Sequence, residues 1–556
     1  IGVFFLALIG IIVWVVRQKQ NDSADYFLGG RDATWLAIGA SIFASNIGSE
    51  HLIGLAGAGA SSGMAMAHWE IQGWMILILG WVFVPFYTRS MVYTMPEFLE
   101  RRYNPQSRTI LSVISLVSYV LTKVAVTVYA GGLVFQQVFG IKELWGIDFF
   151  WIAAIGLVVL TALYTIFGGM KSVLYTSVLQ TPILLLGSLI ILVLGFKELG
   201  GWDEMMRVCG AVTVNDYGDT MTNLIRSNDD ANFPWLGALI GSAIIGFWYW
   251  CTDQFIVQRV LSGKNEMEAR RGTIFGAYLK LLPVFLFLIP GMIAFALHQK
   301  YIGAGGEGFL PMLANGTANA DAAFPTLVAK LLPAGVKGLV VCGILAALMS
   351  SLASLFNSSA MLFTIDFYKR FKPETPEKKL VGIGQIATIV IVVLGILWIP
   401  IMRSVGDVLY TYLQDVQSVL APGIAAAFLL GICWKRTSAQ GGMWGLISGM
   451  VIGLTRLGAK VYYSNAGEVA DSTFKYLFYD MNWLFFCGWM FLFCIIVVIV
   501  VSLATEAPTA EKIQGLVFGT ATKEQKAATR ASWNHWDIIH TVIILAITAA
   551  FYWYFW

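Results

Sequence analysis

The sequence predicts an all-α membrane protein built from about fourteen transmembrane helices. Of its 556 residues, 58% are hydrophobic and only 12% are charged, whereas soluble domains contain about 25% charged residues. The apolar residues recur in stretches of about 20, the length that spans the hydrocarbon core of a bilayer. A net charge of +3 is too small to indicate nucleic acid as a partner, so we expect a lipid bilayer as the surroundings.

The apolar stretches define the expected spans in chain order. They are 1–17, 35–60, 68–89, 109–138, 147–167, 173–196, 235–260, 270–298, 335–368, 379–402, 407–432, 439–460, 480–504 and 536–556. Lys and Arg are concentrated on alternate connections, and the positive-inside rule places those connections in the cytoplasm. We therefore expect a multi-pass protein of the plasma (inner) membrane with both termini extracytoplasmic.

The second expected span is interrupted by a polar segment. Within FASNIGSEHLIGLAGAGA, at 43–60, the polar residues Asn46, Glu50 and His51 lie in an apolar run, where an unsatisfied polar group costs several kcal/mol. Ser, Asn and Gly are poor helix formers, and unwound backbone at mid-membrane exposes carbonyl oxygens that can bind a cation. We interpret the segment as part of a binding site, since a helix-packing face explains GLAGAGA but explains the polar residues poorly.

The ninth span carries a second polar patch, ALMSSLASLFNSSA, in which Ser and Asn recur at helical spacing. Most serines in membrane helices hydrogen-bond to the carbonyl four residues earlier, so the patch taken alone is weak evidence for ligand binding. Opposite an unwound helix, however, Ser350 and Ser351 would supply neutral oxygens suited to a small alkali cation.

Three other spans each carry a charged residue in an apolar setting. Glu70 lies in HWEIQGW, Asp253 follows three aromatic residues in FWYWCTDQ, and Lys280 lies in YLKLLP. An ionisable residue inside the membrane indicates a functional site, with a structural ion pair as the alternative. Aromatic faces beside hydrogen-bonding groups are what a polyhydroxylated ring requires.

Together these motifs resemble the sodium/glucose cotransporters of the solute:sodium symporter family. The resemblance runs over nearly the whole chain, through DYFLGGR, GASIFASNIGSEHLIGLAGAGA, YTMPEFLERRY, ALYTIFGGM, FWYWCTDQFIVQRVLSGKN, GAYLKLLPVFLFLIPGM, LMSSLASLFNSSAMLFTIDFYKR and LAPGIAAAFLLGICWKR. It implies a leucine-transporter (LeuT) type fold with two inverted five-helix repeats. The expected organisation is a first helix and cytoplasmic linker at 1–34, a first repeat at 35–196, an extracellular loop at 197–234, a second repeat at 235–432 and C-terminal transmembrane helices at 433–556.

The resemblance also implies a function and a site. The function is sodium-coupled import of a monosaccharide, an aldohexose such as glucose, galactose or mannose, by alternating access. The residues implied for the sugar are Asn46, His51, Glu70, Tyr249, Trp250, Lys280 and Gln414. The ligands implied for the coupling ion, Na+, are the carbonyls of Ala44, Ile47 and Ala347 and the hydroxyls of Ser350 and Ser351.

Three positions depart from the pattern of the family. Gln417 stands where the animal carriers commonly have a Thr near the sugar, so the identity of the hexose stays open, and another polyol such as myo-inositol is the alternative. Ser177 stands where the family usually has Asp, and Ala353 where a hydroxyl is common. Both belong to the second sodium site of other members, so we predict one Na+ per solute.

Two other classes of function are open alternatives. A membrane-embedded enzyme would draw on Glu50, His51, His68 and Glu70, but no HExxH motif or nucleophile elbow accompanies them, and we expect no enzyme. A sugar-gated sensor or sodium channel would use the same site without coupled transport. Counterflow of labelled hexose in sealed vesicles distinguishes this second alternative.

Overall fold

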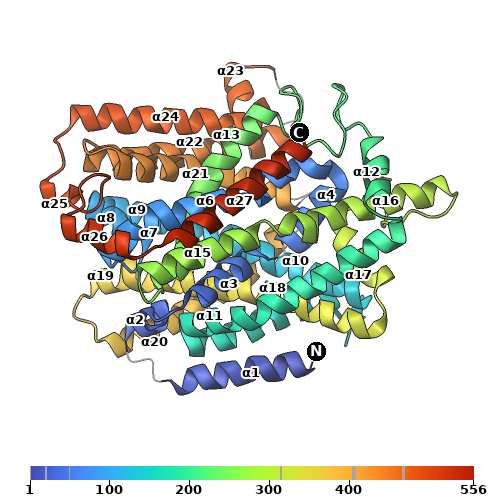
Figure 1. Ribbon diagram of the computed structural model, residues 1–556, viewed down its shortest axis with the longest axis horizontal. Coiled ribbons are helices and arrows are strands. Elements are labelled where there is room, and N and C mark those ends of the chain that lie inside the picture. The colour runs from blue at the N-terminus through green and yellow to red at the C-terminus, as the bar shows by residue number, and fades with distance from the viewer. Residues whose placement is uncertain (1, 19–21, 49, 314–315, 403–408, 466–469) are drawn as a thin grey trace.

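The computed structural model describes residues 2–18, 22–48, 50–313, 316–402, 409–465 and 470–556. Helices make up most of this part of the chain and are gathered into one bundle (Figure 1). The one sheet among the described residues is an antiparallel hairpin of β1 (Glu143–Leu144) and β2 (Ile147–Asp148). The predicted all-α class is therefore confirmed.

The helices of the first 234 residues are numbered in chain order; η1, η3 and η8 are 3₁₀ turns and the other η elements are π-helical. They are α1 (Gly2–Arg17), α2 (Ser23–Leu28), η1 (Gly29–Arg31), α3 (Trp35–Asn46), η2 (Glu50–Leu55), α4 (Ala56–Ser62), η3 (Gly63–Met66), α5 (Ala67–Glu70), α6 (Gly73–Ile78), η4 (Leu79–Phe83), α7 (Val84–Ser90), α8 (Met95–Arg102), α9 (Pro105–Ser118), η5 (Tyr119–Val124), α10 (Ala125–Phe139), α11 (Phe149–Leu199) and α12 (Trp202–Gly210).

The rest of the chain is organised in the same way. Its helices are α13 (Trp235–Gly246), η6 (Phe247–Thr252), α14 (Gln254–Leu261), α15 (Glu266–Lys280), η7 (Val284–Leu288), α16 (Ile289–Gly303), η8 (Ala320–Ala322), α17 (Ala323–Leu331), α18 (Ala334–Met361), η9 (Leu362–Tyr368), α19 (Lys369–Phe371), α20 (Glu377–Met402), α21 (Leu409–Cys433), α22 (Ala439–Asn465), α23 (Thr473–Lys475), η10 (Tyr476–Asp480), α24 (Trp483–Ala504), α25 (Ala510–Ile513), α26 (Lys523–Ala531) and α27 (His535–Tyr554).

Each of the fourteen expected apolar stretches contains helical structure. Within the described residues, nine helices are long and apolar enough to cross a membrane, and three shorter ones, Gly2–Arg17, Trp35–Asn46 and Ala125–Phe139, are also apolar. The count of long helices is lower than fourteen partly because some expected spans are broken into pieces and others run on into one another.

The expected spans 147–167 and 173–196 run on into one another in α11. A loop was expected between them, but helix continues through it, interrupted at Gly169 by a backbone of φ 53° and ψ −150°. A side chain is strained at that positive φ. A Cβ there would also meet the carbonyl oxygen of Tyr26, so glycine lets the two halves of α11 bend closely around α2.

Several helices begin at caps that the sequence encodes. The side chains of Thr94, Asn104 and Asn265 accept hydrogen bonds from the backbone N–H three residues later, at the starts of α8, α9 and α15. Pro105 occupies the first turn of α9, where its missing N–H leaves no partner unsatisfied. In Figure 1, α2, α8, α19, α25 and α26 lie toward one end of the bundle and α12 and α17 toward the other.

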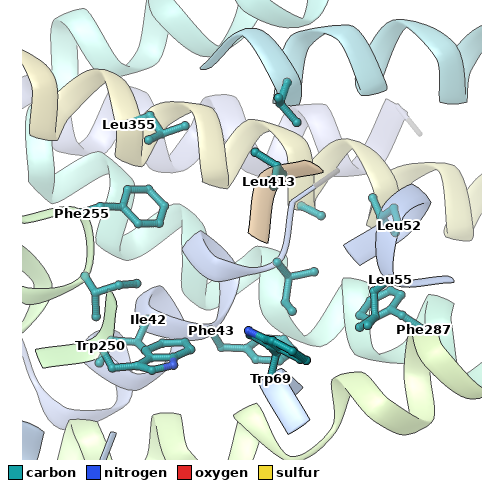
Figure 2. Packing of buried hydrophobic residues seen from close by; sticks show 14 of the residues in the cluster. Ile42, Phe43, Leu52, Leu55, Trp69, Trp250, Phe255, Phe287, Leu355 and Leu413 are labelled. Carbon is teal, nitrogen blue, oxygen red and sulfur yellow. The ribbon is translucent and has the colours of Figure 1, made fainter. Parts of the chain in front are cut away.

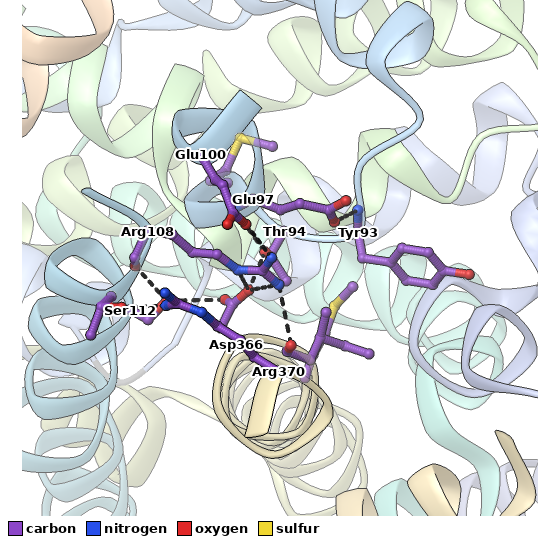
Figure 3. Close-up of polar contacts among 12 residues, drawn as sticks. Tyr93, Thr94, Glu97, Glu100, Arg108, Ser112, Asp366 and Arg370 are labelled. Atoms are coloured by element: carbon purple, nitrogen blue, oxygen red, sulfur yellow. Dashed lines mark hydrogen bonds and ion pairs between the residues drawn. The ribbon is translucent and has the colours of Figure 1, made fainter. Parts of the chain in front are cut away.

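An ionic cluster centred on the buried Asp366 joins α8 and α9 to η9 (Figure 3). Asp366 accepts hydrogen bonds from Arg108 Nε at 2.8 Å, from Thr94 Oγ1 at 2.8 Å and from Ser112 Oγ at 3.1 Å. Arg108 Nη1 also lies 2.6 Å from a carboxylate oxygen of Glu100. We call this set, Thr94, Glu100, Arg108, Ser112 and Asp366, the η9 brace.

The hydrophobic core extends to the interruption between α3 and η2. Figure 2 shows Phe43, before the interruption, and Leu52 and Leu55, after it, with side chains from α5, η6, α14, η7, α18 and α21 around them. All of the labelled side chains are buried. Apolar side chains therefore pack around the interruption, and Asn46 and Ile47 within it are themselves buried.

Candidate functional site

The predicted interruption of the second span is present. Helix α3 ends at Asn46, Ile47 is extended with φ −81° and ψ 104°, and helical structure resumes at Glu50 as the π-helical turn η2. In the described part of the chain, no backbone N–H donates to the carbonyl oxygens of Ala44 and Ile47. These are two of the three carbonyls expected to bind Na+.

A cavity of about 60 Å³ adjoins the interruption, enough for several water-sized groups. All seven residues expected to bind the solute line it: Asn46, His51, Glu70, Tyr249, Trp250, Lys280 and Gln414. They come from α3, η2, α5, η6, α15 and α21. The structure thus brings together residues that are up to 368 positions apart. We call this cavity the central pocket.

One wall of the central pocket is a chain of polar contacts. Lys280 Nζ lies 2.6 Å from Glu70 Oε2, and His51 Nε2 lies 3.2 Å from the same oxygen. Asn46 Nδ2 is 3.4 Å from His51 Nε2. All four side chains are buried. Along this wall an amide, an imidazole, a carboxylate and an ammonium group therefore lie side by side.

Aromatic rings complete this wall. Lys280 Nζ lies 5.4 Å from the ring centroid of Trp250, a cation–π distance. Trp250 Nε1 donates to Gln72 Oε1 at 3.3 Å, and Gln72 in turn donates to the carbonyl of Ser242 at 2.8 Å. The indole is thereby held at its polar edge while its ring contributes an apolar surface to the pocket.

A second ion pair, not predicted, adjoins the pocket, and its Lys123 is a lining residue. Lys123 Nζ lies 2.7 Å from Asp253 Oδ2, and Tyr119 donates to the other carboxylate oxygen. Lys123 Nζ also lies 4.6 Å from the Tyr249 centroid and 4.7 Å from that of Phe255. The sequence signal was available, because Lys123 is a lysine within an apolar span, as Lys280 is.

Gln414 presents an acceptor to the central pocket. Its side chain is buried, and within the described residues its Oε1 has no hydrogen-bond partner. A buried acceptor without a partner is unfavourable by about 1–3 kcal/mol. A hydroxyl group bound in the pocket would relieve this. Glu50, Gln72, Thr127 and Gln417 are further polar residues of the lining.

The expected sodium-binding serines lie beside the interruption. Ser350 and Ser351 are buried on α18, and Ser351 Oγ is 3.0 Å from the point where a Cβ on Gly48 would stand. Ala347 precedes Ser351 by four residues, so both face the same side of the helix. Ser45 on α3 and Ser354 on α18 lie about one helical turn from Gly48 and Ser351, and their Oγ atoms are 2.6 Å apart.

Ser177, where the family resemblance leads us to expect Asp, belongs to a cluster of hydroxyl groups. Its Oγ donates to the carbonyl of Val173 at 2.6 Å. It also lies 3.3 Å from Ser350 Oγ and 3.5 Å from Ser41 Oγ. The position therefore adjoins the expected sodium ligand Ser350.

His68, one of the four residues considered for an enzymatic site, lies elsewhere. Its Nδ1 is 2.9 Å from the hydroxyl of Tyr552, and its Nε2 is 3.1 Å from the carbonyl of Leu224. It does not line the central pocket. Glu50, His51, His68 and Glu70, the residues that the alternative of a membrane-embedded enzyme would draw on, therefore do not form one cluster.

Comparison with known proteins places the chain in a family. Residues 26–449 match the model of the sodium:solute symporter family. The chain is 36% identical over 531 residues to the human sodium/myo-inositol cotransporter 2, covering 93% of this chain and 78% of that protein. It is 37% identical over 543 residues to the dog sodium/myo-inositol cotransporter, covering 93% and 74%.

A solved structure gives the fold. The substrate-bound outward-open state of a Na+-coupled sialic acid symporter superimposes with a TM-score of 0.71 at 22% identity, covering 91% of this chain and 98% of that one. The fold is thus that of the LeuT-type transporters, as the sequence resemblance implied. The family consists of transporters. This chain, a multi-pass membrane protein, belongs to the sodium:solute symporter family.

Proposed function

We propose that the protein imports a polyhydroxylated six-membered ring together with Na+ by alternating access across the plasma membrane. The central pocket is the solute site, lined by Asn46, His51, Glu70, Tyr249, Trp250, Lys280 and Gln414. The observation that carries the proposal is the convergence of these seven residues, from six helical elements, on one cavity beside an interrupted helix.

The chemistry of the lining fits such a ring. Hydroxyl groups donate and accept hydrogen bonds, and the wall offers both kinds of partner in the Glu70 carboxylate, the Lys280 ammonium and the Gln414 amide. The apolar faces of the ring can stack on Trp250 and Tyr249, whose own rings meet edge to face at 4.9 Å.

Na+ is the coupling ion of the family, and we assign its site to Ala44, Ile47, Ala347, Ser350 and Ser351. The carbonyl oxygens of Ala44 and Ile47 are free of backbone donors in the described residues. Ser351 lies next to Gly48 of the interruption and also lines the central pocket. Neutral oxygens from an unwound helix and a facing helix are the ligands that discontinuous-helix transporters use for Na+.

Two solutes of this class are candidates. The sugar-site motifs favour an aldohexose such as glucose, galactose or mannose. The names of the relatives, sodium/myo-inositol cotransporters, favour myo-inositol, which carries hydroxyl groups around a six-carbon ring. Both need the same kind of pocket, so the distinction depends on measured uptake.

Uptake into sealed proteoliposomes tests the proposal. Labelled glucose, galactose, mannose and myo-inositol are each offered under an inward Na+ gradient, with K+ replacing Na+ as the control. We expect concentrative uptake of at least one solute with Na+ and none with K+. Counterflow of the same solute separates a transporter from a sensor or channel, because only a transporter exchanges it. If none of the four solutes is taken up or exchanged, the proposal is wrong.

We propose that two repeats, 35–196 and 235–432, move relative to each other during transport. The first helix and linker are then 1–34, the outer loop is 197–234, and the C-terminal helices are 433–556. The two chain ends would face outward. Accessibility of engineered cysteines to a membrane-impermeant reagent, at each end of the chain, tests this orientation.

A further inference from the structure

We propose that the carboxylate of Glu50 serves both binding sites, balancing the charge of the bound sodium ion and accepting a hydrogen bond from the solute. This proposal rests on the proposed function. Glu50 was not among the residues expected to bind either partner, yet it lines the central pocket. It lies in the first turn of η2, directly after the interruption.

The position of Gly48 shows how close Glu50 comes to the sodium-site serine. A Cβ on Gly48 would stand 2.5 Å from Glu50 Oε2 and 3.0 Å from Ser351 Oγ. The carboxylate and the hydroxyl therefore approach the same small space, which is open only because residue 48 has no side chain. The carboxylate thus reaches back over the interruption toward the assigned ion ligands.

A sodium site made only of the assigned ligands would hold a full charge among neutral oxygens. Taking a cation out of water is strongly unfavourable unless its ligands compensate the lost hydration, and a nearby opposite charge stabilises it further. The other carboxylate of the pocket, Glu70, already lies 2.6 Å from Lys280 Nζ and 3.2 Å from His51 Nε2. The Glu50 carboxylate lies beside Gly48 and Ser351, where it can compensate the ion.

A shared carboxylate also provides a route for coupling. A bound ion would hold the Glu50 carboxylate in one position within the solute site. The solute would then bind a site that is already ordered, and each ligand would favour binding of the other. The same reciprocity predicts that loss of the carboxylate weakens both ligands, whereas loss of a serine hydroxyl weakens only the ion.

A simpler role for Glu50 is stabilisation of the helix that begins at η2, since acidic residues are favoured near helix N-termini. That role predicts lower stability in Glu50→Gln with unchanged ion affinity. The two roles are therefore separated by measuring ion binding directly, without solute.

The experiment measures binding of radioactive Na+ to the purified protein in the absence of solute, and solute binding at saturating Na+. We expect Glu50→Gln to weaken Na+ binding about ten-fold or more and also to weaken solute binding at saturating Na+. Ser351→Ala should weaken Na+ binding alone. Glu198→Gln, outside the central pocket, should change neither.

Unchanged Na+ affinity in Glu50→Gln, with weakened affinity in Ser351→Ala, overturns this inference and leaves the proposed function intact. Absence of Na+ binding to the unmodified protein contradicts the proposed function itself. Should Glu50→Gln not fold, Gly48→Ala takes its place, because the added methyl group fills the space between carboxylate and hydroxyl. Na+ affinity must then fall by a similar factor, and unchanged affinity overturns the inference.

Discussion

The ammonium group of Lys280 lies 2.6 Å from a carboxylate oxygen of Glu70, and both side chains are buried. The two residues are 210 positions apart in the chain, on α15 and α5. In the sequence, each of these charged residues lay in an apolar span without an evident partner. The structure shows that each compensates the charge of the other. It also means that the structural and the binding roles of these residues have to be separated by experiment.

Removal of one partner should be strongly destabilising. Lys280→Met leaves a buried carboxylate without its main partner, which costs about 3–5 kcal/mol. The double variant Glu70→Gln with Lys280→Met should recover most of that stability without recovering solute binding. Thermal unfolding in detergent and solute binding measure the two effects. A Lys280→Met protein as stable as the unmodified one would show that the pair does not matter to the fold.

Gln414→Ala should weaken solute binding by about 1–3 kcal/mol, or roughly ten- to a hundred-fold, because it removes an acceptor that faces the pocket. Gln385→Ala is the matched control. Gln385 donates to the carbonyl of Ile166 at 3.1 Å, outside the central pocket. Equilibrium binding of labelled solute at saturating Na+ is the measurement, and equal effects of the two substitutions would argue against a direct contact.

Ser350→Ala and Ser351→Ala should raise the Na+ concentration needed for half-maximal uptake. Saturating Na+ should restore solute affinity, because an ion affects the solute only through its own occupancy. Ser358→Ala is the control on the same helix, since Ser358 donates to Gln258 at 2.7 Å. Sodium titrations at fixed solute test this, and a normal Na+ requirement in both variants would move the site elsewhere.

The predicted ratio is one Na+ per solute, because Ser177 contributes a hydroxyl where a second sodium site would need a carboxylate. One Na+ supplies about 2.3 kcal/mol at 100 mV and about 1.4 kcal/mol for a ten-fold gradient, so accumulation is limited to several hundred-fold. The reversal potential of solute-driven current measures the ratio. Ser177→Asp should raise the ratio, and a ratio of two in the unmodified protein would contradict the prediction.

Disruption of the η9 brace should destabilise the protein. Arg108→Ala leaves Asp366 buried without its cationic partner, at a cost of about 3–5 kcal/mol. The control is Arg101→Ala. Arg101 is 45% exposed in its pair with Glu97, and such pairs contribute less than about 1 kcal/mol. Thermal unfolding compares the two variants. Similar shifts in Tm would show that the η9 brace stabilises the protein no more than an exposed ion pair does.

The parts of the structure that the sequence revealed are those with a local signal. Length and apolarity located the spans, and the poor helix formers around Asn46 located the interruption. The pairing of Lys123 with Asp253 was not predicted, because nothing local links residues 130 positions apart. The continuity of α11 was also missed, since Gly169 was interpreted as a connection whereas the backbone bends there and continues as helix.

The candidate site was predictable for a different reason. Polar side chains in hydrocarbon are few, so Asn46, Glu70 and Lys280 each marked a position that needs a partner. The full set of seven solute residues came from the family resemblance, and all seven line one cavity. Glu50 was noticed in the same segment but was given no part in the transporter site. The Glu50 carboxylate and the Ser351 hydroxyl come close only at Gly48, which has no side chain. Their approach depends on how α18 packs against the interruption, and the spacing of residues in the sequence does not encode it.

The π-helical turn η6 has a consequence for how this chain is aligned with its relatives. A π turn closes its hydrogen bonds across one more residue than an α turn, so it inserts an extra position into the count. The lining positions Gly246 and Tyr249 and the lining position Phe255 therefore follow two different helical phases. Asp253, with φ −76° and ψ 127°, then ends the turn before α14 begins. Deletion of one residue within 247–252 would move each later position of the turn by one, which is a rotation of about 100° on a helix. An alignment that places a gap in this segment would therefore assign different residues to the positions that face the pocket.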